Sequence, residues 1–252
     1  MDRITDMERV KFEICCNSLA SAINAEKAGA DRIELCANLQ NGGTTPSIGM
    51  IEMCSKRTQI AINVLIRPRG GDFLYTDDEF EEIKTDIRKC KEYRVNGIVC
   101  GILTKDGEID IERTRELVEL SRPLEFTFHR AFDLSKDHIR SLRDVISTGA
   151  DRILTSGMRR TAYEGKEILA DLVRAAKDSI IIMPGSGINE SNIRELYKEI
   201  GAKEYHFSAS KRVDSQMEFR RENVLSSVED DFTITYSDLD KIINTKKQIQ
   251  NL

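Results

Sequence analysis

The sequence has no apolar run long enough to cross a membrane, no C-x-x-C pair and no excess of basic charge. A membrane helix needs roughly 18 consecutive apolar residues. Without a C-x-x-C pair, the six cysteines form neither a zinc knuckle nor a thioredoxin-type motif. A net charge of −5 argues against a general nucleic-acid binder, which needs a basic face for phosphates. We therefore expect no membrane partner and no nucleic-acid partner.

The first ten residues (MDRITDMERV) are rich in charge and have no apolar centre of the kind a signal peptide needs. A cytoplasmic location is therefore expected, and cysteine thiols stay reduced there. Hydrophobic residues make up 40% of the chain and charged residues 32%, which is typical of a soluble globular protein. Most of the cysteines are expected to be buried core residues.

Short β-branched runs alternate with longer amphipathic stretches along the chain. The expected strands are Lys11–Cys15, Arg32–Leu35, Ile60–Ile66, Gly97–Gly101, Glu125–His129, Arg152–Thr155, Ile180–Met183 and Glu204–Phe207. Helix starts between them are indicated by capping boxes and N-cap residues: Thr76–Glu79, Thr161–Glu164, Ser18, Ser47, Asp110 and Ser135. A last helix is expected from about Ser237. Eight strands alternating with eight helices favour a closed (β/α)8 barrel.

An internal repeat supports closure. Gly29–Cys36 (GADRIELC) recurs as Gly149–Ser156 (GADRILTS), at the starts of the second and sixth strands, and Gly201–Lys203 is a weaker copy. A doubly wound sheet predicts no repeat at half-barrel spacing. We therefore predict a single-domain TIM barrel over residues 1–252, with its core at about 10–210. Residues 211–235 are expected to form a long loop, whose composition favours disorder, and 236–252 the terminal helix.

Functional side chains of such barrels lie at the C-terminal ends of the strands. Glu13 and Glu34 fall on neighbouring strands, and each lies on the same face of its strand as the residue two positions later. Both are candidate proton-transfer groups. Their like charges require a cation, for which Arg67 is nearest in strand order. The alternative is an internal salt-bridge network that only fills the barrel.

Two of the three histidines, His129 and His206, fall at strand ends. Both are candidate general acids or bases, as is Asp133 in the same loop as His129. The alternative for each histidine is that it orients a loop. His138 is expected on a helix surface and receives no role.

Glycine-rich and arginine-rich loops follow several strands and predict an anion site. Glycines let backbone N–H groups approach an oxyanion, and arginine matches carboxylate or phosphate geometry. Barrels of this class often bind phosphate after strands 7 and 8. The predicted anion-binding residues are Arg67, Arg69, Arg130, Gly185, Gly187 and Ser208.

Cys15 and Cys36 end neighbouring strands in this arrangement, about 5 Å apart. Two thiolates at that separation can chelate a soft monovalent ion such as Cu(I), and the lack of an evident third ligand fits Cu(I) better than zinc. The alternative is a pair of buried thiols without a role.

Several motifs together resemble the CutC copper-homeostasis family. They are the segment Glu13–Ser47, RPRGGDFLY from Arg67, TFHRAFD from Thr127, RILTSG from Arg152 and PGSGI from Pro184, within a resemblance that covers roughly residues 11–210. The resemblance implies a cytosolic TIM barrel, a homo-oligomer (most simply a dimer) and a link to copper tolerance. It also implies that Cys15 and Cys36 occupy positions proposed for Cu(I) in relatives, although Cys16 makes the ligand assignment ambiguous. Met217–Arg220 resembles a short segment of the family's last loop, which favours an ordered, site-facing loop there.

Three functional hypotheses follow. The first is a copper-homeostasis protein that binds Cu(I) through Cys15 and Cys36. The second is an enzyme that acts on a small anionic or phosphorylated metabolite, with arginines holding the anion and Glu13, Glu34 or His129 transferring protons. The third is a barrel used as a protein-binding scaffold. The sequence leaves open whether the protein is an enzyme.

Overall fold

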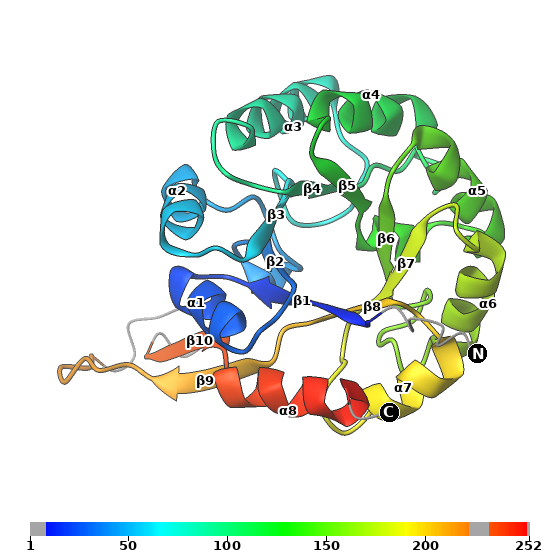
Figure 1. Ribbon diagram of the computed structural model, residues 1–252. Helices are drawn as coiled ribbons and strands as arrows, with labels where there is room; N and C mark the ends of the chain where they lie inside the picture. The colour runs from blue at the N-terminus through cyan, green and yellow to red at the C-terminus, as the bar shows by residue number, and fades with distance from the viewer. Residues whose placement is uncertain (1–8, 222–231, 251–252) are drawn as a thin grey trace, which may run out of the picture.

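The structure, a computed structural model, describes residues 9–221 and 232–250 (Figure 1). Its strands are β1 (Lys11–Cys16), β2 (Arg32–Leu35), β3 (Ala61–Leu65), β4 (Gly97–Cys100), β5 (Glu125–Phe128), β6 (Arg152–Thr155), β7 (Ile181–Pro184), β8 (Glu204–Phe207), β9 (Ser210–Asp214) and β10 (Thr233–Ser237). Its α-helices are α1 (Leu19–Lys27), α2 (Ile48–Arg57), α3 (Asp77–Cys90), α4 (Ile111–Ser121), α5 (His138–Thr148), α6 (Lys166–Ala176), α7 (Ile193–Ile200) and α8 (Leu239–Gln250). Two short 3₁₀ helices, η1 (Leu39–Asn41) and η2 (Arg130–Leu134), follow β2 and β5.

The first eight strands form one sheet in the order β7-β6-β5-β4-β3-β2-β1-β8, and all of its paired strands are parallel. The ends of this sheet, β7 and β8, lie beside each other, and the helices form a ring outside the strands (Figure 1). The predicted TIM barrel is confirmed. Among the described residues, no helix has the length and apolar character needed to span a bilayer.

Strand parity divides the buried residues into two layers. The outward-facing residues of the strands, such as Phe12, Ile14 and Ile33, belong to the main apolar core that packs against the helices. The alternate residues of the same strands include Glu13 and Arg32, which are 1% and 7% exposed. Most hydrophobic burial therefore lies between strands and helices, while charged side chains occupy much of the barrel interior.

The helix starts largely follow the sequence. Thr76 and Glu79 form a reciprocal capping box, and Ser18, Ser47 and Asp110 cap α1, α2 and α4 as expected. Thr161 and Glu164 exchange the predicted hydrogen bonds, but the regular helix α6 begins only at Lys166, five residues after Thr161.

The Ser135 prediction is wrong. Its hydroxyl donates to the Phe132 carbonyl at the end of η2, and Asp137 caps α5 by accepting from the Arg140 N–H at 2.7 Å. The 3₁₀ helix η2, between β5 and α5, forms from residues that were expected to belong to the loop before α5.

The segment predicted as a long loop, 211–235, contains an antiparallel hairpin instead. Strand β9 pairs with β10 from Ser210 opposite Ser237 to Asp214 opposite Thr233. The hairpin lies beside α1 and α8 (Figure 1). Residues 222–231 lie outside the described part of the chain. Met217 and Phe219 are exposed, and α8 begins at Leu239 rather than at Ser237.

Candidate functional site

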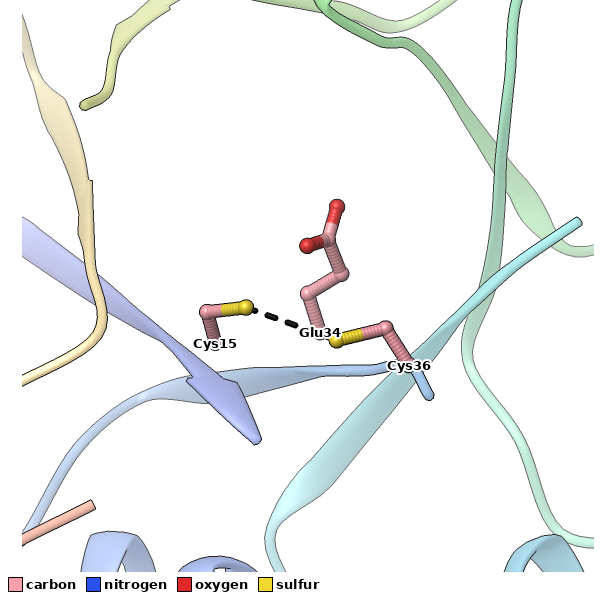
Figure 2. Close-up of side chains that lie close together, drawn as sticks. All are labelled: Cys15, Glu34 and Cys36. Carbon is pink, nitrogen blue, oxygen red and sulfur yellow. Dashed lines mark hydrogen bonds between the residues drawn. The ribbon is translucent and has the colours of Figure 1, made fainter. Parts of the chain in front are cut away.

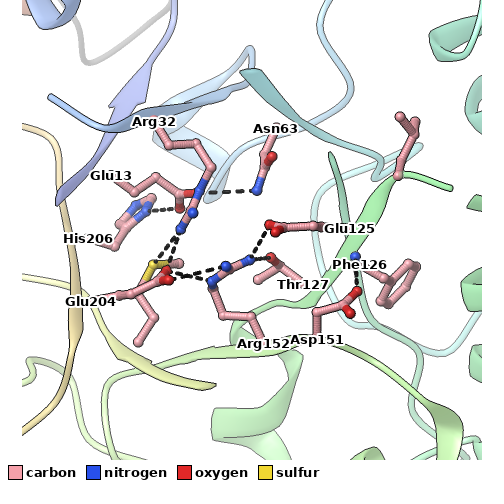
Figure 3. A network of polar contacts seen from close by, with 12 residues as sticks. Glu13, Arg32, Asn63, Glu125, Phe126, Thr127, Asp151, Arg152, Glu204 and His206 are labelled. Atoms are coloured by element: carbon pink, nitrogen blue, oxygen red, sulfur yellow. Dashed lines mark hydrogen bonds and ion pairs between the residues drawn. The ribbon is translucent and has the colours of Figure 1, made fainter. Parts of the chain in front are cut away.

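The barrel interior holds a buried network of ion pairs (Figure 3). Arg32 donates from Nε to Glu13 Oε2 at 2.5 Å and from Nη2 to Glu204 Oε2 at 2.6 Å. Arg152 donates to the same Glu204 oxygen at 2.6 Å and to Thr127 Oγ1 at 3.2 Å. Burial is tolerated because two guanidinium groups offset two carboxylates and provide several hydrogen bonds.

The predicted cation for Glu13, Arg67, is therefore wrong. In the sheet register, Glu13 of β1 lies opposite Arg32 of β2, so Arg32 is the adjacent positive charge. Sequence reasoning missed Arg32, Arg152 and Glu204. A signal was present, because Arg32 shares its parity with Glu34 and Arg152 occupies the equivalent position of the second repeat.

The repeat has a local structural cause. In each copy the aspartate accepts the backbone N–H of the preceding strand: Asp31 from Phe12 at 2.9 Å, and Asp151 from Phe126 at 2.7 Å. The next residue is the inward-pointing arginine. The glycine that starts the second copy, Gly149, ends α5 with a φ of 82°, a left-handed conformation that favours glycine. The repeat therefore specifies a strand start together with one interior cation.

Glu13 and Glu34, which were expected on adjacent strands, meet at one place and are joined there by His206. His206 Nδ1 lies 2.8 Å from Glu13 Oε1, and His206 Nε2 lies 3.8 Å from Glu34 Oε2. Burial by itself lowers the pKa of His206, but Glu34, Cys15 and Glu13 raise it well above its usual range. The imidazole is therefore a cation between two carboxylates.

The two glutamates have different electrostatic surroundings. Burial acts to raise the pKa of Glu13, but Arg32 and His206 outweigh it and hold that pKa well below its usual range. For Glu34 the effect of burial dominates, and its pKa is raised. Glu13 therefore belongs to the ion-pair network, while Glu34 is the carboxyl group better suited to exchange a proton.

Cys15 and Cys36 face each other at the ends of β1 and β2, with an Sγ–Sγ distance of 3.5 Å (Figure 2). Contact with Cys36 and burial hold the pKa of Cys15 well above its usual value. Cys16 packs in the outer apolar core, whereas Cys15 and Cys36 form a separate inner cluster with Leu65 and Val99. The geometry thus separates Cys16 from the pair.

A cavity of about 700 Å³ opens at the C-terminal ends of the strands. Several predicted site residues line it: Cys15, Glu34, Arg67, His129, Arg130, Gly187, His206 and Ser208. Sequence reasoning missed its apolar wall and one cation from the last helix: Leu39, Leu65, Phe73, Leu154, Ile188, Phe207 and Lys241. Leu39, Phe73, Leu154 and Ile188 lie within the motifs quoted above, but no sequence pattern indicates that they line a cavity, because only the folded barrel brings its loops and α8 together.

Arg67 is a buried cation that organises the loops around the cavity. Its guanidinium donates to the backbone carbonyls of Asn41, Gly43 and Gly71 at 2.7 to 2.8 Å, and it lies 4.8 Å from the centre of the Phe73 ring. Within the described residues, no carboxylate pairs with it. Its positive charge therefore favours an anion in the cavity.

Three predicted site residues serve the loops instead of the cavity lining. Arg69 is paired with Glu79 and Asp72. Asp133 accepts hydrogen bonds from Thr155, Ser156 and Met158 and so anchors the loop after β6. At Gly185 a Cβ would lie 2.5 Å from Leu154, so packing explains that glycine. These contacts argue against direct anion or proton-transfer roles for the three residues.

His129 does line the cavity, but its surroundings disfavour the predicted acid–base role. Its Nδ1 accepts the Ala131 N–H at 3.2 Å. Burial, together with Arg67 and Arg130, lowers its pKa to about 3. The ring is therefore neutral near pH 7 and poorly matched to proton exchange there.

These features define a class: a (β/α)8-barrel protein with a polar, thiol-edged ligand cavity at the C-terminal mouth of its strands. A family model described as "CutC family" matches residues 10–211. The chain belongs to the CutC family.

Two curated relatives cover most of the chain. A CutC family protein of Parabacteroides distasonis is 49% identical over 94% of this chain and 98% of its own length. The Homo sapiens protein named copper homeostasis protein cutC homolog is 47% identical over 84% of this chain and 78% of its own length. The names of such relatives connect the family with copper homeostasis.

Solved structures agree with the fold. The crystal structure of a CutC protein from Streptococcus agalactiae is 34% identical, with a TM-score of 0.75 over 79% of this chain and 98% of that one. Phosphoribosylanthranilate isomerase from Thermotoga maritima, at 15% identity, has a TM-score of 0.58 over 96% of this chain and 100% of that one. The second likeness concerns the barrel alone.

Proposed function

We propose that this protein binds Cu(I) through Cys15 and Cys36 as part of copper homeostasis. The observation that carries the proposal is the 3.5 Å separation of two inward-facing thiols, one of which lines the cavity. Cu(I) prefers soft thiolate ligands, and a small outward movement of the sulfurs would admit the ion between them. The Glu34 carboxylate lies within 4.8 Å of both sulfurs and is an available third donor (Figure 2).

The donor set fits Cu(I) better than zinc. Structural zinc sites use four nitrogen or sulfur ligands, or oxygen in place of some of them. Among the described residues, the group around the thiol pair contains two sulfurs and one carboxylate. The neighbouring imidazole of His206 is bonded through Nδ1 to Glu13, and its pKa is raised by Glu34, Cys15 and Glu13, so it is a cation and offers no free nitrogen. Contact with Cys36 and burial raise the pKa of Cys15, so Cu(I) would displace thiol protons when it binds.

A competition titration with a chromophoric Cu(I) chelator tests this proposal. The wild-type protein is expected to withdraw one equivalent of Cu(I), and a Cys15→Ser, Cys36→Ser double variant is expected to lose at least about 100-fold in affinity, since each lost thiolate weakens a two-coordinate site. The matched control is Cys54→Ser, Cys90→Ser, which removes two buried thiols on α2 and α3. Equal affinity in the two double variants would rule out this site.

A second candidate function is that of an enzyme acting on a small anionic or phosphorylated metabolite. It is favoured by the size of the cavity, which suits a small molecule and far exceeds the needs of one metal ion. Arg67, Arg130 and Lys241 line this cavity together with Glu34 and His206. Glu34 would exchange the proton, and His206 would stabilise negative charge beside it.

A thermal-shift screen of carboxylated and phosphorylated metabolites tests the second candidate. At least one anion is expected to raise the melting temperature of the wild type by several degrees at saturating concentration. The same anion is expected to have little effect on Arg67→Ala. A screen without any Arg67-dependent stabiliser would remove this candidate.

A cytoplasmic location and assembly as a homodimer are also part of the proposal. The reduced thiol pair fits a reducing compartment. A light-scattering mass equal to one chain would exclude the dimer.

A further inference from the structure

The two thiols of the inner cluster differ in their access to the cavity. Cys15 is 8% exposed and lines the cavity, and its Sγ lies within 4.8 Å of a carboxylate oxygen of Glu34, another lining residue. Cys36 is 1% exposed and does not belong to the lining. The two Sγ atoms are 3.5 Å apart. A small molecule in the cavity can therefore reach one sulfur, and the second sulfur is already in contact with the first.

The positions of Cys15 and Cys36 allow a disulfide after a small movement. The Cys36 N–H donates to the Cys16 carbonyl at 3.0 Å, which holds the ends of the two strands together. The sulfurs must approach from 3.5 Å to about 2.0 Å. The sheet register pairs Cys15 with Glu34, so Cys36 is diagonal to Cys15. Diagonal positions are farther apart than opposed ones, and the resulting strain makes a disulfide easier to reduce.

We propose that Cys15 and Cys36 form a reversible thiol–disulfide pair that exchanges with an acidic, low-molecular-weight disulfide in the cavity. The Cys15 sulfur attacks one sulfur of R–S–S–R, the S–S bond breaks, and one R–SH leaves with the Cys15 proton. Cys36 then attacks the Cys15 sulfur of the mixed disulfide, and the second R–SH leaves with the Cys36 proton. Two protein thiols are oxidised to one disulfide, and R–S–S–R is reduced to two thiols.

The charge of the cavity lining favours an acidic reagent. The charged side chains of the lining are Arg67, Arg130, His206, Lys241, Glu34 and Glu190. Arg130 and His206 already have carboxylate partners. Among the described residues, no carboxylate pairs with Arg67 or Lys241, and no cation pairs with Glu190. Two cations therefore face one carboxylate, and a disulfide with negatively charged R groups is attracted to the cavity.

Proximity of the two thiols outweighs their slow ionisation. Contact with Cys36 and burial raise the pKa of Cys15, so little thiolate is present near pH 7 and the first attack is slow. Once a mixed disulfide forms on Cys15, the neighbouring Cys36 sulfur captures it as an intramolecular reaction. A disulfide would remove both sulfur ligands of the proposed copper site, but the exchange itself requires no copper.

The test treats reduced, copper-free protein with an excess of dithiodiglycolate, a small acidic disulfide, and identifies the products by intact mass and peptide mapping. The wild type is expected to lose two hydrogens and to yield a peptide cross-linked between Cys15 and Cys36. Cys36→Ser is expected to stop at one R–S adduct on Cys15. Cys15→Ser is expected to leave Cys36 unmodified, because Cys36 is buried.

Cystamine, a cationic disulfide, tests the reagent class. Each rate is divided by the rate at which the same disulfide reacts with a small neutral thiol. The corrected rate of the wild type with cystamine is expected to be at least about tenfold lower than with dithiodiglycolate. An equal or higher corrected rate with cystamine overturns the assignment to acidic disulfides.

Cys16→Ala is the matched control, because Cys16 is the next residue in the chain but packs in the outer apolar core. It is expected to form the same cross-link as the wild type, and melting temperatures confirm that each variant is folded. Failure of the wild type to form the Cys15–Cys36 cross-link in excess dithiodiglycolate overturns the proposal, whatever the variants do. Dithiothreitol is expected to restore both thiols, and a cross-link in the folded protein that resists it contradicts a reversible pair.

Discussion

Arg32→Met is expected to lower the free energy of unfolding by about 3–5 kcal/mol, because it leaves Glu13 and Glu204 buried without one of their cations. The carboxylates of Glu13 and Glu204 are 0% and 3% exposed, so water cannot replace the guanidinium. Chemical denaturation at pH 7 measures the change. The Arg32→Lys variant is expected to have a free energy of unfolding between those of the wild type and Arg32→Met, because one ammonium group cannot reproduce the planar guanidinium that bonds both carboxylates.

The control for Arg32 is Arg122→Met. Arg122 pairs with Asp151 on the surface, where its side chain is 43% exposed, and its loss is expected to cost less than about 1 kcal/mol. Adding Glu13→Gln to Arg32→Met is expected to restore part of the lost stability, because it removes one uncompensated charge. Equal effects of Arg32→Met and Arg122→Met would show that the interior network contributes no more than a surface pair.

Gly165→Ala is expected to destabilise the protein by about 3 kcal/mol through a backbone collision. A Cβ at Gly165 would overlap the carbonyl oxygen of Ser156 and lie 2.9 Å from that of Gly157. Neither oxygen belongs to a flexible side chain, so the turn before α6 and the loop after β6 must separate. The φ of Gly165 is −96°, which alanine adopts freely, so the effect is steric.

Gly49→Ala is the matched glycine control and has the opposite expected sign. Gly49 lies in the first turn of α2 with nothing within 4 Å of the added Cβ, and alanine favours the helix by about 0.5–1 kcal/mol. Thermal and urea unfolding of the two variants measure the contrast. A Gly165→Ala variant as stable as Gly49→Ala would mean that the β6 loop can move at little cost.

Much of the candidate site follows from strand parity. Glu13 and Glu34 were expected on adjacent strands, with Cys15 on the same face as Glu13, because alternate residues of a strand share a face. His206 was predicted only as a strand-end acid or base, and closure of the barrel, which sets β8 beside β1, places it against Glu13. The thiol pair follows from the same rule. The hairpin of β9 and β10 was not predicted, because short charged strands have little apolar alternation and depend on each other for pairing.

The roles of individual polar groups were harder to assign. The side chains of His129 and Asp133 are of types that commonly transfer protons. Burial, however, keeps the His129 ring neutral, and hydrogen bonds from the loop after β6 occupy the Asp133 carboxylate. Arg67 and Arg69 are two residues apart, but only Arg67 is left without a carboxylate among the described residues. Desolvation and partner choice decide such differences, and neither is a local property of the chain.

The sequence by itself determined the barrel, the strand ends at which the site lies and the thiol pair at its edge, because these depend on periodicity and on the order of elements along the chain. Only the tertiary structure decided that Arg32 and Arg152 neutralise the interior, that the pKa values of Glu13 and Glu34 shift in opposite directions, and that Arg67 is buried beside the cavity without a carboxylate partner among the described residues. The reason is that charge, burial and hydrogen bonding at this site depend on side chains from different strands, which come together only when the barrel closes.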